Sequence, residues 1–248
     1  MGNAEQGSFI KTLGIEFRRL VEERRLNSAV VQVKASPLSP EEAIGSPERK
    51  DYVLLRGKER LVQADILGHR GQAFTDSLGD YQGILDDVLD LPLENNYQRA
   101  VYIASLNAVA AFAGIIGNTI HCRDQGPGEC AKGVVDFFRK NYGSPKILMI
   151  GYQPAMAEAL NTGFELVVLD LDPDNIGKVK NGVSIKDGAA DLGPGLKWCD
   201  VIFATGSTIC NNTIDQYYLA PRPLVLFGIT GSAASALLDI PRYCPEST

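Results

Sequence analysis

Four short apolar runs in the second half of the chain each lead into a polar loop that contains glycine and then into a helix-like segment. The runs are KILMI at 146–150, ELVVLD at 165–170, DVIFA at 200–204 and LVLFG at 224–228. Strands covered on both faces read as continuous apolar runs, and helical crossovers return them in the same direction. The pattern therefore predicts a parallel sheet whose loops gather at one edge, where open α/β sheets bind ligands.

The first half of the chain has a different pattern. Apolar residues at helical spacing predict an amphipathic helix over 9–26, and SAVVQVKA at 28–35 predicts a strand. Two strand-like runs within 51–66 flank a short polar turn, so we expect a hairpin that turns near Gly57 and Lys58. The glycine-rich segment 67–80 then reads as a loop, for which a solvated turn is favoured over a contact with a second domain.

Three further helices are predicted, around 80–90, over 95–117 and over 129–142. The second of these is rich in alanine and apolar nearly all round, so we expect it to be buried. Its interior polar residue, Asn107, must find hydrogen-bond partners there. Asn107 either satisfies neighbouring backbone groups or faces a ligand.

These elements indicate an α/β protein with two domains, an α+β unit over 1–125 made of a strand meander and helices, and a parallel-sheet unit over 126–248. The chain has 248 residues, of which 45% are hydrophobic and 22% are charged. This composition is typical of a globular protein long enough for two small domains.

Charge and targeting signals exclude several classes of protein. A net charge of -6 argues against nucleic acid and against anionic membranes as partners, because both require a basic face. No secretory signal or membrane-spanning run is visible, and five cysteines, an odd number, fit a reducing compartment. We therefore expect a cytoplasmic protein with free thiols, and leave a homo-oligomer open.

Two of the sheet-edge loops carry candidate ligand contacts. GYQPAM at 151–156 stands where a dinucleotide-binding fold has three glycines but supplies one, which weighs against a nucleotide. Tyr152 lies at the mouth of the following helix. Asp170 ends the next strand, where an acidic residue could contact a ribose or another polar ligand, help to bind a hard cation, or form a turn.

The loop ATGSTICNNT at 204–213 concentrates small hydrogen-bonding groups between an apolar strand and a helix. It contains no histidine, so a serine-hydrolase site is not indicated. A binding loop for an anion or polar small molecule is favoured over a purely structural turn. The candidate ligand-binding residues are Asn107, Tyr152, Asp170, Thr205, Gly206, Ser207, Thr208, Asn211, Asn212 and Thr213.

HCRDQGPGEC at 121–130 holds His121, Cys122 and Cys130 within ten residues. Thiolates and imidazole are suitable ligands for zinc, iron or other transition metals, although the spacing is not that of a zinc finger. A transition-metal site, a redox thiol and ordinary packing of buried cysteines all remain open. Sequence spacing does not show whether the other cysteines converge on these three residues.

Together, ATGSTICNNTID, LDLDPDNIG, the alanine-rich helix with SLNAV, and HCRDQGPGEC resemble the putative heavy-metal chelation domain family. The resemblance spans nearly the whole chain. It implies an enolase-N-terminal-like domain followed by a Rossmann-like domain, with a presumed active site in the cleft between them. It also points to Asn107, and to Thr205, Gly206, Ser207, Asn211 and Thr213 at the sheet edge.

The leading hypothesis is a two-domain protein that binds a small polar or anionic ligand, or a metal chelate, in the interdomain cleft. A nucleotide-dependent transferase or oxidoreductase is the competing enzyme hypothesis, with Asp170 on a ribose. The third hypothesis is a thiolate metal-binding protein or metallochaperone that uses Cys122 and Cys130. The catalytic residues, if the protein is an enzyme, are not indicated.

Overall fold

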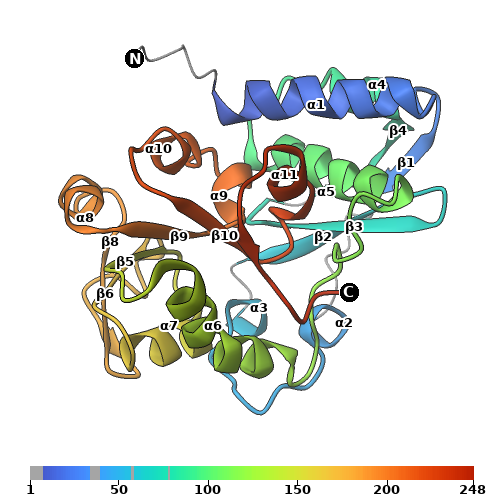
Figure 1. Ribbon diagram of the computed structural model, residues 1–248. Coiled ribbons are helices and arrows are strands. Elements are labelled where there is room, and N and C mark those ends of the chain that lie inside the picture. Colours follow the sequence, from blue (N-terminus) through green and yellow to red (C-terminus); the bar gives the residue numbers. More distant parts are fainter. Residues whose placement is uncertain (1–7, 34–39, 57–58, 78) are drawn as a thin grey trace, which may run out of the picture.

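The chain forms two sheets, one in each half of the sequence (Figure 1). The computed structural model describes residues 8–33, 40–56, 59–77 and 79–248. The first sheet has four antiparallel strands in the order β3-β2-β1-β4, and the second has seven mostly parallel strands. The predicted α/β class is therefore confirmed.

The first sheet consists of β1 (Val30–Val33), β2 (Arg60–Ile66), β3 (His69–Thr75) and β4 (Tyr81–Ile84). Its hairpin joins β2 to β3 and turns at Leu67 and Gly68, which both have positive φ, as a two-residue hairpin turn of this hand requires. The hairpin predicted within 51–66 is wrong. Val53–Arg56 forms the short helix α3, and the predicted turn at Gly57 and Lys58 lies outside the described residues.

The loop predicted over 67–80 is also wrong, because half of this segment is the strand β3. A Cβ on Gly71 would lie 2.3 Å from the carbonyl oxygen of Ala104, so the helix α5 (Asn96–Phe112) packs directly on the backbone of β3. Small residues permit this close approach. The same small residues give the strand the composition of a loop.

Three of the helices described in the first half cover one face of its sheet. Helix α1 (Phe9–Glu23) confirms the predicted amphipathic helix, and α4 (Leu85–Leu89) and α5 follow the sheet. Helix α5 is buried over most of its length, as predicted, because it packs on β2 and β3 and also contacts α9 and α11 of the second half. The short helix α2 (Pro40–Ile44), like α3, packs in the other core cluster.

The second sheet has the strand order β11-β10-β9-β5-β6-β8-β7. The four predicted strands are present and parallel, as β5 (Ile147–Ile150), β6 (Leu166–Asp170), β9 (Val201–Thr205) and β10 (Leu224–Phe227). The sheet also contains β7 (Val179–Lys180), β8 (Val183–Asp187) and β11 (Arg242–Tyr243). Among the strands of this sheet that the structure describes, β7 alone runs antiparallel to its neighbour.

Helices cover both faces of this sheet (Figure 1). One face carries α6 (Gly126–Tyr142) and α7 (Pro154–Asn161). The other face carries α8 (Leu192–Trp198), α9 (Ser207–Cys210) and α11 (Ser232–Leu237), and α10 (Asp215–Tyr218) lies near α9. This double cover explains why the central strands read as unbroken apolar runs.

The hydrophobic core does not divide between the halves of the chain. One buried cluster joins α1, α5 and the first sheet to Leu148, Ile202 and Leu226 of the second sheet. The other joins the opposite face of the second sheet to Ile44, Tyr52 and other residues of the first half. We propose the boundary between residues 125 and 126 as the point where the chain passes from one sheet to the other.

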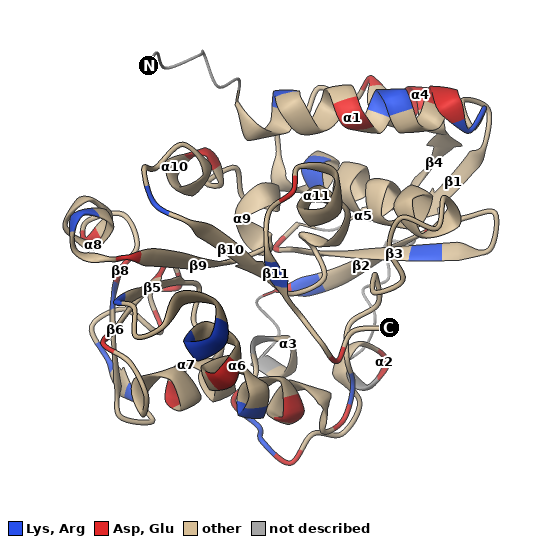
Figure 2. Cartoon of the chain, in the orientation of Figure 1, with Lys and Arg blue, Asp and Glu red and all other residues tan. Residues whose placement is uncertain are grey.

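The surface charge is mixed. Acidic and basic positions are interspersed along α1 and α6, as Figure 2 shows. Within the part of the chain that the structure describes, no helix is long and apolar enough to cross a membrane.

Candidate functional site

A cavity of about 480 Å³ lies at the carboxyl ends of the parallel strands and is lined by residues of both halves of the chain. Strand β5 has β6 on one side and β9 on the other, so the chain leaves β5 in one direction and later returns to its opposite side. This change of direction is where open α/β sheets form a ligand crevice. The cavity therefore lies at the edge that the sequence predicted.

Most of the predicted site residues line this cavity. Those in its wall are Tyr152, Asp170, Thr205, Ser207, Thr208, Asn211, Thr213, His121, Cys122 and Cys130. Asn107, Gly206 and Asn212 are not among the residues that line it.

Gly151 brings two strand ends together at the cavity floor. It has φ 86°, and a Cβ at this position would lie 2.7 Å from Cγ2 of Thr205. Only glycine adopts this conformation readily, and only glycine leaves space for the Thr205 methyl group. The end of β5 can therefore lie directly beside the end of β9.

The loop after β9 is ordered by its own side chains. The Thr208 hydroxyl donates to the carbonyl oxygen of Thr205 over 2.7 Å, and the Thr213 hydroxyl donates to Oδ1 of Asn211 over 2.7 Å. Ser207 is buried, with its hydroxyl 3.3 Å from that of Thr205. These contacts present neutral hydroxyl and amide groups to the cavity.

Asp170 is engaged by the protein itself. Its carboxylate accepts hydrogen bonds from the backbone amides of Tyr152 (2.9 Å) and Asp172 (2.8 Å) and from Nδ2 of Asn175 (3.1 Å). The helix start at α7 is capped by Gln153, whose Oε1 accepts from the amide of Met156. A nucleotide would use the Asp170 carboxylate for its ribose and the start of α7 for its phosphates. Both groups therefore already have protein partners.

Asn107 links the two halves of the chain. Its Nδ2 donates to the carbonyl oxygens of Gln72 (2.9 Å) and Ile229 (3.2 Å), and its Oδ1 accepts from the amide of Ala233 (2.9 Å). The side chain is fully buried. The Asn107 amide thus binds backbone groups of the protein, which is one of the two interpretations that the sequence leaves open.

The other two predicted residues outside the lining have backbone roles. A Cβ on Gly206 would lie 2.5 Å from the backbone nitrogen of Gly231, so this glycine allows the loops after β9 and β10 to touch. Asn212 has φ 62°, a left-handed conformation that asparagine tolerates better than most residues.

His121 is held on the wall formed by the first half of the chain. Its backbone amide donates to Oε1 of Gln72 over 2.7 Å, and its Nδ1 lies 3.2 Å from the carbonyl oxygen of Ala43. The ring contacts Phe74 edge to face. Burial lowers the pKa of His121 to about 4, so the imidazole is neutral at pH 7.

Four of the five cysteines line the cavity, and all five are free. Cys122 and Cys130 are neighbours whose thiols interact, which raises the pKa of Cys122 and lowers that of Cys130. Cys244 lies close enough to Cys122 to contribute to the rise in its pKa, and burial raises the pKa of Cys244 itself. Cys210 lines the cavity from α9, whereas Cys199 lies outside it.

These donors do not form a complete metal site. Among the residues described by the structure, no three histidine, cysteine, aspartate or glutamate side chains are placed to bind one metal ion together. Structural and catalytic zinc sites use three or four protein ligands. The residues present therefore do not fit a metal held by the protein alone.

One cavity residue that the sequence did not indicate is Glu59, which precedes β2. Burial and the nearby carboxylates of Asp170, Asp76 and Asp172 raise the pKa of Glu59 to about 7. Nothing in the local sequence distinguishes this glutamate from a surface residue. Its importance comes from tertiary contacts alone.

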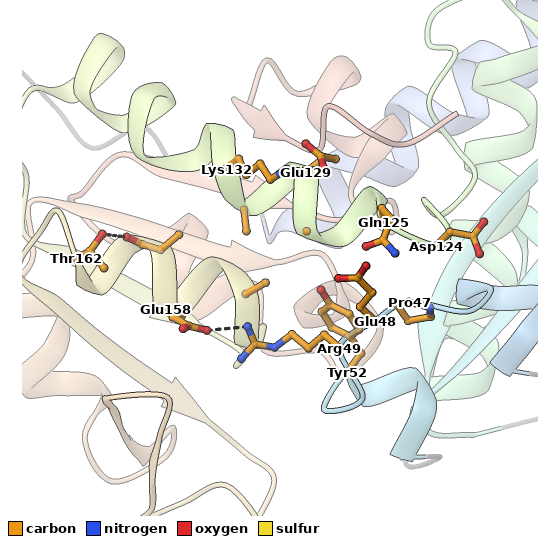
Figure 3. A pocket seen from close by; sticks show the side chains of 14 residues that line it. Pro47, Glu48, Arg49, Tyr52, Asp124, Gln125, Glu129, Lys132, Glu158 and Thr162 are labelled. Carbon is orange, nitrogen blue, oxygen red and sulfur yellow. Dashed lines mark hydrogen bonds and ion pairs between the residues drawn. The ribbon is translucent and has the colours of Figure 1, made fainter.

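A second hollow of about 420 Å³ lies on the outer side of Tyr52, between α6 and α7 (Figure 3). Arg49 pairs there with Asp51 and Glu158, and Lys132 pairs with Glu129. Tyr52 lines both this outer pocket and the inner cavity. Because the basic groups of the outer pocket are already paired, the inner cavity is the stronger candidate site.

Two solved structures are similar to this chain, and the first of them supports the fold. A Pyrococcus horikoshii protein of the DUF364 family, described as having unknown function, matches with a TM-score of 0.55 at 15% identity over 90% of this chain and 80% of its own. A Desulfitobacterium hafniense protein of the same family, also of unknown function, has a TM-score of 0.49 at 16% identity over 72% of each chain. No curated protein matches.

The family model that matches covers the parallel-sheet half of the chain. It spans residues 134–241, from within α6 to just before β11, and includes the loops after β5, β6, β9 and β10 that border the cavity. The resemblance inferred from the motifs is therefore confirmed for this part of the chain, which matches the DUF364 family model, described as "Putative heavy-metal chelation".

Proposed function

We propose that this protein binds a small organic molecule with metal-coordinating groups, as a free chelator or as its metal complex, in the cavity between the two sheets. The observation that carries this proposal is the composition of the cavity wall. Thiols and a neutral imidazole come from 121–130, and hydroxyl, amide and carboxylate groups come from the sheet edge opposite. The volume of about 480 Å³ is typical of small-molecule sites.

The incomplete set of metal ligands supports a chelate rather than a bare ion. Cys122, Cys130 and His121 offer donors suited to transition metals, but they do not converge as a group on one position. A metal that enters this cavity needs its remaining ligands from another source. A bound chelator supplies them, and its polar groups can contact the Thr205 loop.

The nucleotide hypothesis has less support. The Asp170 carboxylate and the helix start at α7 both have protein partners, and the loop after β5 lacks two of the three glycines of a dinucleotide site. Five free cysteines support a reducing compartment, and we extend the proposal to a cytoplasmic location.

The test uses equilibrium dialysis with nickel alone and with nickel complexed to 2,2′-bipyridine, histidine or citrate. Nickel is measured by elemental analysis and the chelator by mass spectrometry. We expect the wild-type protein to retain nickel and chelator together from at least one complex. Ser207→Phe, which fills the cavity, should abolish this retention, whereas Ser184→Phe on the exposed side of β8 should not.

A Cys122→Ser, Cys130→Ser double variant addresses the role of the thiols. It should weaken retention of the complex without unfolding the protein, as checked by thermal melting. Stoichiometric retention of bare nickel by the wild type would instead show a protein-only metal site. That result, or the retention of none of the complexes, would contradict the proposal.

A further inference from the structure

Four carboxyl groups from both halves of the chain meet at one side of the cavity. The hairpin register pairs Arg60 with Thr75, so Glu59 and Asp76 stand together at the open end of β2 and β3. Asp170 ends β6, and Asp172 follows it. All four residues line the cavity, and the three aspartates act electrostatically on Glu59.

The protein holds these aspartates in place. Asp76 accepts hydrogen bonds from Nδ2 of Asn96 (2.8 Å) and from the Ser77 hydroxyl (3.0 Å). The Asp170 carboxylate accepts the three hydrogen bonds described above, and Asp172 accepts one from the backbone amide of Asp174 (3.0 Å). These hydrogen bonds fix the positions of the three aspartate side chains in the cavity wall.

The described residues that line the cavity include no lysine or arginine. Arg99 lies behind the wall, near Cys210, and its guanidinium donates to the carbonyl oxygens of Cys210 and Leu93 and to Oδ1 of Asn96. Cys210 faces Glu59 from α9, and its pKa is raised chiefly by burial. His121 is neutral in the neutral pH range.

The charge balance of the wall favours one class of ligand. An anion would meet four carboxyl groups in a partly buried setting, which opposes binding. A cation would be attracted to the same groups, and the low polarity of the surroundings would strengthen that attraction. Glu59 is the member of the group whose proton a cation can displace near neutral pH.

We propose that the cavity selects a ligand that bears a protonated amine and recognises this amine through the Glu59 carboxylate. The inference rests on the proposed function, since it assigns a charge to the ligand of the same cavity. It narrows the expectation of a polar or anionic ligand to a cationic one. The hydroxyl groups of the Thr205 loop then contact the remainder of the molecule.

The test is isothermal titration calorimetry with 1,3-diaminopropane and with malonate, which have the same three-carbon skeleton and opposite charges. The diamine should bind the wild type and malonate should not. Glu59→Gln should weaken diamine binding at least tenfold at pH 8. Asp174→Asn, which removes one charge from the same loop region outside the lining, should leave it unchanged.

Proton release provides a second measurement. A carboxyl group with a pKa of about 7 must ionise to pair with the amine, so the affinity should rise about tenfold from pH 6 to pH 8. Titrations at pH 6 in phosphate and in MES should reveal proton release, because the two buffers differ in heat of ionisation. Glu59→Gln should show neither effect.

Several outcomes would overturn the inference. These are absence of diamine binding to the wild type, preferential binding of malonate, or unchanged diamine affinity in Glu59→Gln. Ser207→Phe checks that the diamine occupies the cavity. If a nickel complex is retained in the cavity while the diamine fails to bind, the proposed function stands and only the assigned charge is wrong.

Discussion

At the scale of single residues, the main finding is that ionisation of Glu59 lowers the stability of the folded protein. Burial and, to a smaller extent, three nearby carboxylates oppose its negative charge, so the folded protein holds the Glu59 proton to a higher pH than the unfolded chain does. Stability linked to this group is therefore lost as the pH rises from about 4.5 to about 7. Above pH 7 Glu59 is ionised in the folded protein, and the full loss of stability applies.

Glu59→Gln removes this loss of stability, because glutamine remains neutral at every pH. We expect the variant to be more stable than the wild type at pH 8, by up to about 3 kcal/mol, and nearly equal to it at pH 5. Thermal melting of both proteins at the two pH values measures the difference. A stability change of the same size at pH 5 and pH 8 would show that Glu59 does not titrate in this window.

The sequence pointed to some of the residues that line the cavity and missed others for a physical reason. Thr205, Ser207 and Asn211 follow a buried strand, so local pattern alone places them at the carboxyl edge of the sheet. Glu59 and Cys244 reach the same cavity only because distant segments pack together. Asn107 was correctly predicted to be buried, but its backbone partners lie up to 126 positions away in the sequence.

At the scale of elements, the close approach of β5 and β9 determines the cavity floor. Gly151→Ala places a methyl group against Thr205 and forces alanine into a left-handed conformation. We expect a loss of about 1–3 kcal/mol in stability, measured by urea denaturation.

Thr205→Ser in the same chain removes the methyl group that a Cβ at position 151 would meet. The variant that combines Gly151→Ala with Thr205→Ser should recover part of the lost stability. The remaining loss comes from the backbone strain at position 151. A double-mutant cycle isolates this coupling. Strictly additive effects would mean that the two strand ends do not contact each other as the structure shows.

Prediction of the elements succeeded where burial gives a regular pattern. The four central parallel strands and the helices α1, α5 and α6 have continuous apolar runs or clear helical periodicity. Strand β3 was not predicted because its packing against α5 requires a glycine at position 71, and glycine is not typical of strands. Helix α3 was read as a strand because its short apolar run has no period of its own.

At the scale of the whole molecule, the two halves share their hydrophobic core, and Asn107 lies at their interface. Asn107→Leu would leave buried backbone groups of Gln72, Ile229 and Ala233 without this partner. We expect a loss of about 2–4 kcal/mol. Asn141→Leu, at an exposed position on α6, is the control and should change stability by less than about 0.5 kcal/mol.

Calorimetry of the Asn107→Leu variant also tests whether the halves unfold together. Because the core clusters cross between them, the wild type and the variant should each show one transition, with that of the variant at lower temperature. Two separated transitions in the variant would indicate that the halves are independent units joined mainly by this amide.

The position of Asn107 has a consequence for the order of events in folding. Its contacts with Ile229 and Ala233 join segments more than 120 residues apart, so they form only after a very long loop has closed. Loops of this length are slow to close, whereas α5 and the β2–β3 hairpin form from local contacts. The nascent chain should therefore acquire its helices and hairpin early and its cavity last, when the final strands arrive.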